Sequence, residues 1–412
     1  MNNSDFHKFQ LDSIRQGKQI LADSIRLVIY KTLPDYFDTL DFEDDKLFLD
    51  PLLFAYANSS SGRVPEVLMQ LLYGSVPREA RPQTISVKAG PDGKIYLPNV
   101  GWIAGGQPGE SYNLSEYMDQ YSLNGQPVVV EPLCLGNKLG IELLPYKIEL
   151  LSDRYFDVQH RVIAVEIDEP TKKFRRFFNN ALDIIAQKIP WVSVLLQEGC
   201  FKAQIFDDGT DAQLNAHCSK NSFASFNVKG MSFHNVYQEW YDEIFFLDDI
   251  AHQMGHVIFD YMTTDKNRFY KVNHSHAISS TSEYGQIIDS IEKRSYEILF
   301  HALYTYYLIL NVLDSCVDDP QFTEEQQLEL RGRIAFYLRK CALDFEIFEP
   351  FSANEIAAQI FSTDGLYIYQ EMKQSFSVIC SKHGHLFTTC TMNNQAYNYN
   401  HRKFLEANTS LV

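Results

Sequence analysis

Two histidines four residues apart form the pattern with the clearest chemistry in this 412-residue sequence. His252 and His256 lie in LDDIAHQMGHVIFDYM, a segment whose apolar residues recur with helical spacing. Residues four apart project from one face of a helix about one turn apart, so both imidazoles can bind a single metal ion. Imidazole suits zinc, iron, copper or nickel, and two helical histidines need at least one further ligand.

We predict His301 as the third ligand, in the downstream helical segment EKRSYEILFHALYTYYLIL. A short segment with strand character, FASFNVKG, precedes the histidine helix, and this order of strand, histidine helix and second helix is the minimal zincin arrangement. Two alternatives stay open. His301 lies among apolar residues and could be a core histidine satisfied by one hydrogen bond, and Glu297, one turn earlier, could be the ligand instead.

Gln253 stands where a zinc protease of the HExxH type has the glutamate that deprotonates a metal-bound water. A carboxamide can hydrogen-bond that water but cannot accept its proton, so ordinary peptide hydrolysis is disfavoured. Oxidative chemistry at ferrous iron needs a cosubstrate and no such base. Arg294, two turns before His301, could then bind the carboxylate of a keto acid. The alternative for this arginine is a local ion pair with Glu297 or Glu292.

These segments resemble a known family. The order of a strand, the LDDIAHQMGH helix and RSYEILFHALY, over roughly residues 172–315, resembles the HExxH-motif peptide-modification proteins, which are α-ketoglutarate-dependent peptide β-hydroxylases. The resemblance implies iron(II) on His252, His256 and His301, with α-ketoglutarate and O2 as cosubstrates. It also implies a ribosomally made precursor peptide as substrate, hydroxylated at a β-carbon. The chain departs from the family at Gln253, which we place beside the open coordination positions.

Two other functions remain open on the same residues. Three imidazoles also accept zinc, so the chain could be a zinc hydrolase whose base comes from outside the motif, as Glu297 or Glu239. It could also be a catalytically silent relative that binds a peptide or a partner enzyme. Peptide cleavage without α-ketoglutarate would favour the hydrolase, and binding without turnover would favour the silent relative.

Further residues could orient the metal ligands, line the site or form a second metal site. Asp248 and Asp249, about one turn before His252, could orient its second ring nitrogen or could belong to a solvated helix face. His274 and His276 lie in the loop before the second helix, at the mouth of the site or simply on the surface. The stretch CSKHGHLFTTC from Cys380 to Cys390 holds potential zinc ligands, but its spacing matches no zinc module.

The elements that must position these residues predict an α+β fold in which helix exceeds strand. Apolar spacing predicts helices at about residues 235–262, 283–313 and 324–341, and a further helix over 169–199 that breaks near Pro190. We expect a helical N-terminal module at 1–81, a β-rich segment at 82–170, a zincin-like catalytic part at 171–372 and a loosely attached tail at 373–412. A small mixed sheet should back the histidine helix.

Composition restricts the partners and the cellular compartment that we expect for this protein. A formal charge of -17 disfavours binding to nucleic acid or to an anionic membrane, because both need a basic surface. The polar N-terminus and the lack of an apolar run of about 18 residues predict a cytoplasmic protein. Seven scattered cysteines suit reduced thiols. These features do not determine the oligomeric state.

Overall fold

The computed structural model describes residues 4–59, 63–118, 120–155, 163–209, 221–276, 294–348, 356–395 and 398–409. The chain is mixed helix and sheet, with 57% helix and 13% strand, so helix exceeds strand as the sequence predicts. It divides into two compact units. Unit 1 consists of Met1–Ile14, Ala181–Leu195 and Asp242–Val412, and unit 2 consists of Arg15–Asn180 and Leu196–Tyr241.

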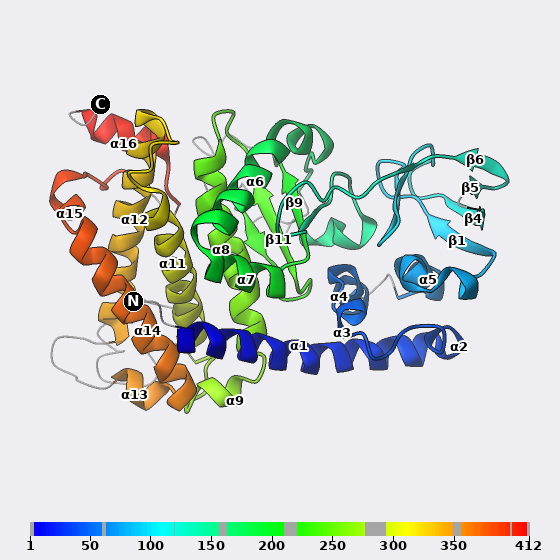
Figure 1. Cartoon of the computed structure of the whole chain (residues 1–412), viewed down its shortest axis with the longest axis horizontal. Helices are drawn as coiled ribbons and strands as arrows, with labels where there is room; N and C mark the ends of the chain where they lie inside the picture. Colours follow the sequence, from blue (N-terminus) through cyan, green and yellow to red (C-terminus); the bar gives the residue numbers. More distant parts are fainter. Residues whose placement is uncertain are drawn as a thin grey trace. The chain divides into compact units, whose positions relative to one another are not determined.

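Unit 1 is helical in the ranges that the structure describes. Helix α11 packs against three others, α8, α12 and α14 (Figure 1). The long helices of unit 1 agree with the helical spacing of apolar residues in the sequence, because each helix buries an apolar face along most of its length. The helices of this unit that the structure describes are α8 (Glu243–Met262), α9 (Lys266–Phe269), α11 (Tyr296–Cys316), α12 (Glu324–Phe348), α13 (Ile356–Ile360), α14 (Thr363–His383), α15 (Leu386–Thr389) and α16 (His401–Ala407).

Gly255 lets α8 and α11 approach closely. A Cβ atom at this position would lie 3.1 Å from Leu308 Cδ1 and 3.4 Å from Thr305 Cγ2, both on α11. A glycine in a helix interior costs about 1 kcal/mol relative to alanine, so its presence here reflects packing and not helix propensity. The close approach brings the histidine face of α8 next to α11.

Three helices contribute residues to both units. They are α1 (Ser4–Thr32), α6 (Asp168–Lys188) and α7 (Pro190–Gly199). The predicted break near Pro190 is confirmed, since α6 ends at Lys188 and α7 begins with the proline. Proline suits the first helical position because its missing N–H has no intrahelical partner there.

Unit 2 combines short helices with three sheets. Its helices are α2 (Pro34–Phe37), α3 (Asp45–Phe48), α4 (Pro51–Ala57), α5 (Pro65–Leu72), η1 (Tyr73–Ser75), η2 (Arg78–Ala80) and η3 (Glu149–Arg154). One antiparallel sheet has the order β1-β4-β5-β6 and a second has the order β2-β3-β7. These strands are β1 (Thr84–Lys88), β2 (Ile95–Leu97), β3 (Gly101–Ile103), β4 (Ser111–Tyr117), β5 (Gln120–Leu123), β6 (Gln126–Val128) and β7 (Val130–Glu131).

The third sheet of unit 2 is mixed and has the order β10-β11-β9-β8. Its strands are β8 (Glu142–Leu143), β9 (Lys202–Phe206), β10 (Phe223–Ala224) and β11 (Met231–Asn235). Every residue of β9 and β11 is buried, as parallel strands covered on both faces usually are. This small mixed sheet belongs to unit 2 and the histidine helix belongs to unit 1, so a sheet that backs this helix stays a prediction.

The C-terminal residues pack into unit 1. Phe404 on α16 is fully buried, and the guanidinium of Arg333 lies 4.9 Å from the centre of the Tyr399 ring. The loosely attached tail that the sequence suggested is therefore not observed over residues 398–409. Polar residues separate these aromatic residues in the sequence, so the apolar pattern did not predict that they pack in the unit. In the described ranges no helix is long and apolar enough to cross a membrane.

Candidate metal centre

Helix α8 presents two imidazoles from an otherwise buried segment. It begins after Asp242, whose carboxylate caps the helix by accepting a hydrogen bond from the N–H of Ile244 at 2.8 Å. The whole helix is described, and between Ile244 and Met262 only His252 and His256 are not buried. After its first residue, Glu243, the partly accessible residues of this helix are therefore the two best suited to bind a metal.

The structure brings His301 to this pair. The ring centres of His252 and His256 lie 5.0 Å apart, and those of His256 and His301 lie 4.4 Å apart. All three residues belong to unit 1, on α8 and α11. The three residues selected from sequence thus form one continuous cluster of rings.

His301 also makes the hydrogen bond expected of a core histidine. Its Nε2 lies 3.1 Å from the backbone oxygen of His256, and its ring packs 4.8 Å from that of Phe259. A carbonyl oxygen only accepts, so Nε2 carries the proton of a neutral ring and Nδ1 keeps the lone pair. If His301 binds a metal in this orientation, it does so through Nδ1.

The surroundings keep all three imidazoles neutral. Burial lowers the pKa of His256 to about 4. Burial also lowers the pKa of His252 well below its ordinary value, and electrostatic interactions with His256 and Lys340 lower it further. For His301 burial is again the largest cause of a strongly lowered pKa. Neutral imidazole is the form that binds metal ions, so no proton has to leave at pH 7.

The described residues contain no ready-made metal site. No group of three or more His, Cys, Asp or Glu side chains among them already has an arrangement that could hold a metal ion. The donor set fits a transition metal in type. The ring nitrogens would still have to turn toward a common point to bind one.

Gln253 is held within its own helix. It is 4% exposed, and its Nε2 donates to Asp249 Oδ1 at 3.3 Å, one turn earlier. Asp249 is itself buried, so the alternative of a solvated helix face for the two aspartates is wrong. Asp248, equally buried, pairs with Arg333 at 2.5 Å. The placement of Gln253 beside open coordination positions stays a prediction.

Arg294 forms an ion pair, but with a residue that the sequence did not suggest. Its Nη1 and Nη2 donate to the two carboxylate oxygens of Asp344 at 3.0 Å and 2.7 Å. Glu297 instead pairs with Lys266 at 2.6 Å, and Glu292 lies outside the described residues. The bidentate geometry expected for a keto acid is thus observed with a carboxylate of the protein.

Sequence reasoning missed the contribution of helix α12. Arg333, Tyr337, Lys340 and Asp344 follow one another at intervals of four, three and four residues, which places them on one face. The Tyr337 ring centre lies 6.5 Å from that of His252, and Lys340 is close enough for its charge to lower the pKa of His252. A stripe of polar residues with helical spacing, within a helix that also has an apolar face, was the signal that could have identified them.

The remaining candidates are Glu239, the two loop histidines and the CSKHGHLFTTC stretch. Glu239 is exposed and belongs to unit 2. His274 lies 3.6 Å from Glu297, and His276 contacts Asn273 at 3.1 Å. In the CSKHGHLFTTC stretch, Cys390 is buried, and His383 contacts Asp314 at 2.7 Å.

No protein-family model matches the sequence, and no curated protein matches it either.

Proposed function

We propose that this chain is an oxygenase that holds iron(II) on His252, His256 and His301 and uses α-ketoglutarate and O2 to hydroxylate a β-carbon in a precursor peptide. The observation that supports it best is that two imidazoles on the buried helix α8 keep partial access to solvent, with the ring of His256 next to that of His301. The peptide substrate follows from the family resemblance.

The choice of oxidative chemistry depends on Gln253. Iron(II) bound by these residues would let O2, the oxidant, react with the keto acid and the peptide: one oxygen atom would enter the succinate that forms with CO2 from the keto acid, and the other would be inserted into the peptide C–H bond. The residues of the chain have to bind the metal, orient the cosubstrate and limit water. A carboxamide that donates to Asp249 cannot serve as the general base of a hydrolase. Of the two candidate bases from outside the motif, Glu297 is paired with Lys266, and Glu239 is exposed and belongs to unit 2.

Two cations near the cluster are candidates for the keto acid carboxylate. Arg294 has the planar geometry for a bidentate pair, but an incoming carboxylate has to compete with Asp344. Lys340 lies on the same face of α12 as Asp344, and burial lowers its pKa to about 8, so it stays mostly protonated at pH 7. We assign the carboxylate to Arg294 and treat Lys340 as the second candidate.

The test is a spectroscopic titration. Metal-free protein is loaded with iron(II) without oxygen, and α-ketoglutarate is added while the visible charge-transfer band of a bidentate keto acid complex is recorded. We expect a band in the wild type that is lost in His301→Ala and retained in His276→Ala, which removes an exposed loop histidine. Tight zinc binding with no band would refute the oxygenase and favour a hydrolase or a silent binding protein.

A further inference from the structure

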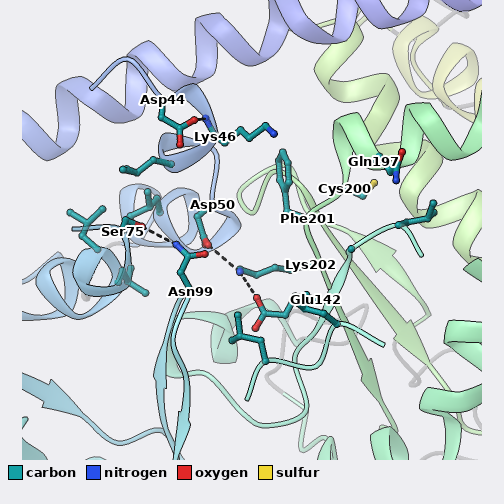
Figure 2. Close-up of a pocket in the computed structure, with 18 of the residues that line it drawn as sticks. Asp44, Lys46, Asp50, Ser75, Asn99, Glu142, Gln197, Cys200, Phe201 and Lys202 are labelled. Carbon is teal, nitrogen blue, oxygen red and sulfur yellow. Dashed lines mark hydrogen bonds and ion pairs between the residues drawn. The ribbon is translucent and has the colours of Figure 1, made fainter. Parts of the chain in front are cut away.

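Unit 2 contains a cavity of about 460 Å³ that the proposed function does not use (Figure 2). One part of its wall is apolar and consists of seven leucines and Phe201. The other part carries charged side chains from the segment before α4 and from β8 and β9. A cavity of this volume lies within the range of known ligand sites.

The charged floor of the cavity is a buried network around Lys202. Its Nζ lies 2.7 Å from Glu142, 3.1 Å from Asp50 and 3.1 Å from the hydroxyl of Tyr96. Glu142 and Lys202 are register partners on β8 and β9, and each is 4% exposed. Burial alone would lower the pKa of Lys202, but Asp50, Tyr96 and Glu142 raise it well above the ordinary value. The lysine is therefore charged and faces two carboxylates.

The outer part of the cavity is also acidic. Asp41 and Asp44 line it from exposed positions, with Lys46 as the basic residue beside them. Four carboxylates and two ammonium groups line the whole cavity, which leaves an excess of negative charge. The whole chain carries a formal charge of -17, which adds long-range attraction for a cation.

The apolar part of the wall reaches the surface. Leu135 lines the cavity and is 50% exposed, although large apolar side chains are stabilised by burial. The lining of the same cavity thus includes both an exposed apolar side chain and exposed carboxylates. An anion such as a phosphate would meet the excess of negative charge and is disfavoured.

We propose that this cavity binds a peptide segment in which a basic side chain is flanked by large apolar ones. The apolar side chains contact the leucine wall and Leu135, and the basic side chain faces Asp41 and Asp44. The inference is independent of the proposed function, since it concerns unit 2 and needs neither metal nor keto acid.

The test uses the full chain and a fluorescein-labelled peptide with one arginine between two leucines. A second peptide has citrulline, which is nearly isosteric but uncharged, in place of the arginine. Fluorescence anisotropy at low ionic strength gives both affinities. We expect the arginine peptide to bind about tenfold more tightly than the citrulline peptide, because a charge-assisted hydrogen bond contributes more than a neutral one.

Variants locate the binding. The double change Asp41→Asn and Asp44→Asn should weaken the arginine peptide roughly fivefold and leave the citrulline peptide unchanged, as expected for two exposed charge pairs. Asparagine at position 44 can still cap α3, where the Asp44 side chain now accepts from the N–H of Lys46. Leu135→Ser should weaken both peptides, and Glu79→Gln, which removes an exposed charge of unit 2 outside the cavity, should weaken neither.

Three outcomes would overturn the proposal. They are equal affinities for the two peptides, unchanged binding of the arginine peptide by the aspartate double variant, and binding of spermidine without binding of the peptide. The last outcome would assign the cavity to small amines. None of them bears on the histidine cluster, because no metal is present in the assay.

Discussion

The histidine cluster makes the stability of the metal-free protein sensitive to acid. Each of the three rings has a pKa that is lowered in the folded state, chiefly by burial. The unfolded chain therefore binds more protons than the folded chain below about pH 6.5, and stability falls as the pH falls. Each such histidine contributes a slope of up to about 1.4 kcal/mol per pH unit.

We predict that replacing one ring reduces this slope. In His256→Gln, the free energy of unfolding should fall less steeply between pH 6.5 and pH 5 than in the wild type, because a group that titrates only on unfolding is gone. Urea denaturation of the metal-free protein at pH 7, 6 and 5 measures this pH dependence of the free energy of unfolding. His276→Ala serves as the control and should keep the wild-type slope. Identical slopes in wild type and His256→Gln would show that His256 is not desolvated.

Substitutions of single residues can also show whether Arg294 or Lys340 binds the keto acid. If Arg294 holds the keto acid, Arg294→Lys keeps the charge, loses the bidentate geometry and should raise the dissociation constant of α-ketoglutarate about tenfold. Lys340→Met should then have a smaller effect. Titration of the iron(II) protein under anaerobic conditions measures both constants, with metal content checked in each variant. A larger effect of Lys340→Met than of Arg294→Lys would instead assign the binding of the keto acid carboxylate to Lys340.

At the scale of elements, the contact between α8 and α11 positions the cluster. Gly255→Val would add a branched side chain where a Cβ already meets Leu308 at 3.1 Å. Overpacking of this kind costs about 1 to 3 kcal/mol, and the separation of the helices should weaken metal binding. Gly255→Ala is the matched control: the flexible end of Leu308 can yield, and helix propensity improves. Thermal unfolding and metal affinity of both variants test this, and equal behaviour would refute the close packing.

Local pattern predicted the elements better than their partners. Apolar periodicity located α8, α11 and α12, because a helix that buries one face repeats it every three or four residues. It also placed His252 and His256 on one face. It could not identify Asp344 as the partner of Arg294, since the two are 50 residues apart and several nearer carboxylates were available. Selection among distant partners depends on packing, which local spacing does not contain.

At the scale of the whole molecule, unit 1 includes two segments that are distant in sequence from its main part, residues 242–412. Gln10 Nε2 donates to the hydroxyl of Tyr304 at 2.8 Å, and Phe6 packs 6.0 Å from Tyr307. Lys188, from a second segment, pairs with Asp319. Residues 4–14 and 181–195 therefore complete the core of the unit that contains the histidines.

A fragment of residues 242–412 should consequently fail to fold cooperatively. It keeps all three histidines but leaves the buried Tyr304 hydroxyl without Gln10 and exposes the apolar surface that Phe6 covers. Near-ultraviolet circular dichroism during heating measures the loss, with Gln10→Ala in the full chain as a milder control, expected to cost about 1 kcal/mol. A sharp transition in the fragment, similar to that of the full chain, would contradict the division into these units.

The central claim is that three imidazoles on two helices bind one transition metal, and elemental analysis tests it most directly. Metal-free protein is incubated with iron(II) without oxygen, freed of excess metal and analysed, alongside the His252→Ala, His256→Ala, His301→Ala and His276→Ala variants. We predict one metal per chain in the wild type and in His276→Ala, and a large loss in each of the other three, all of them folded by circular dichroism. Equal metal content in every variant, or none in the wild type, would contradict the account.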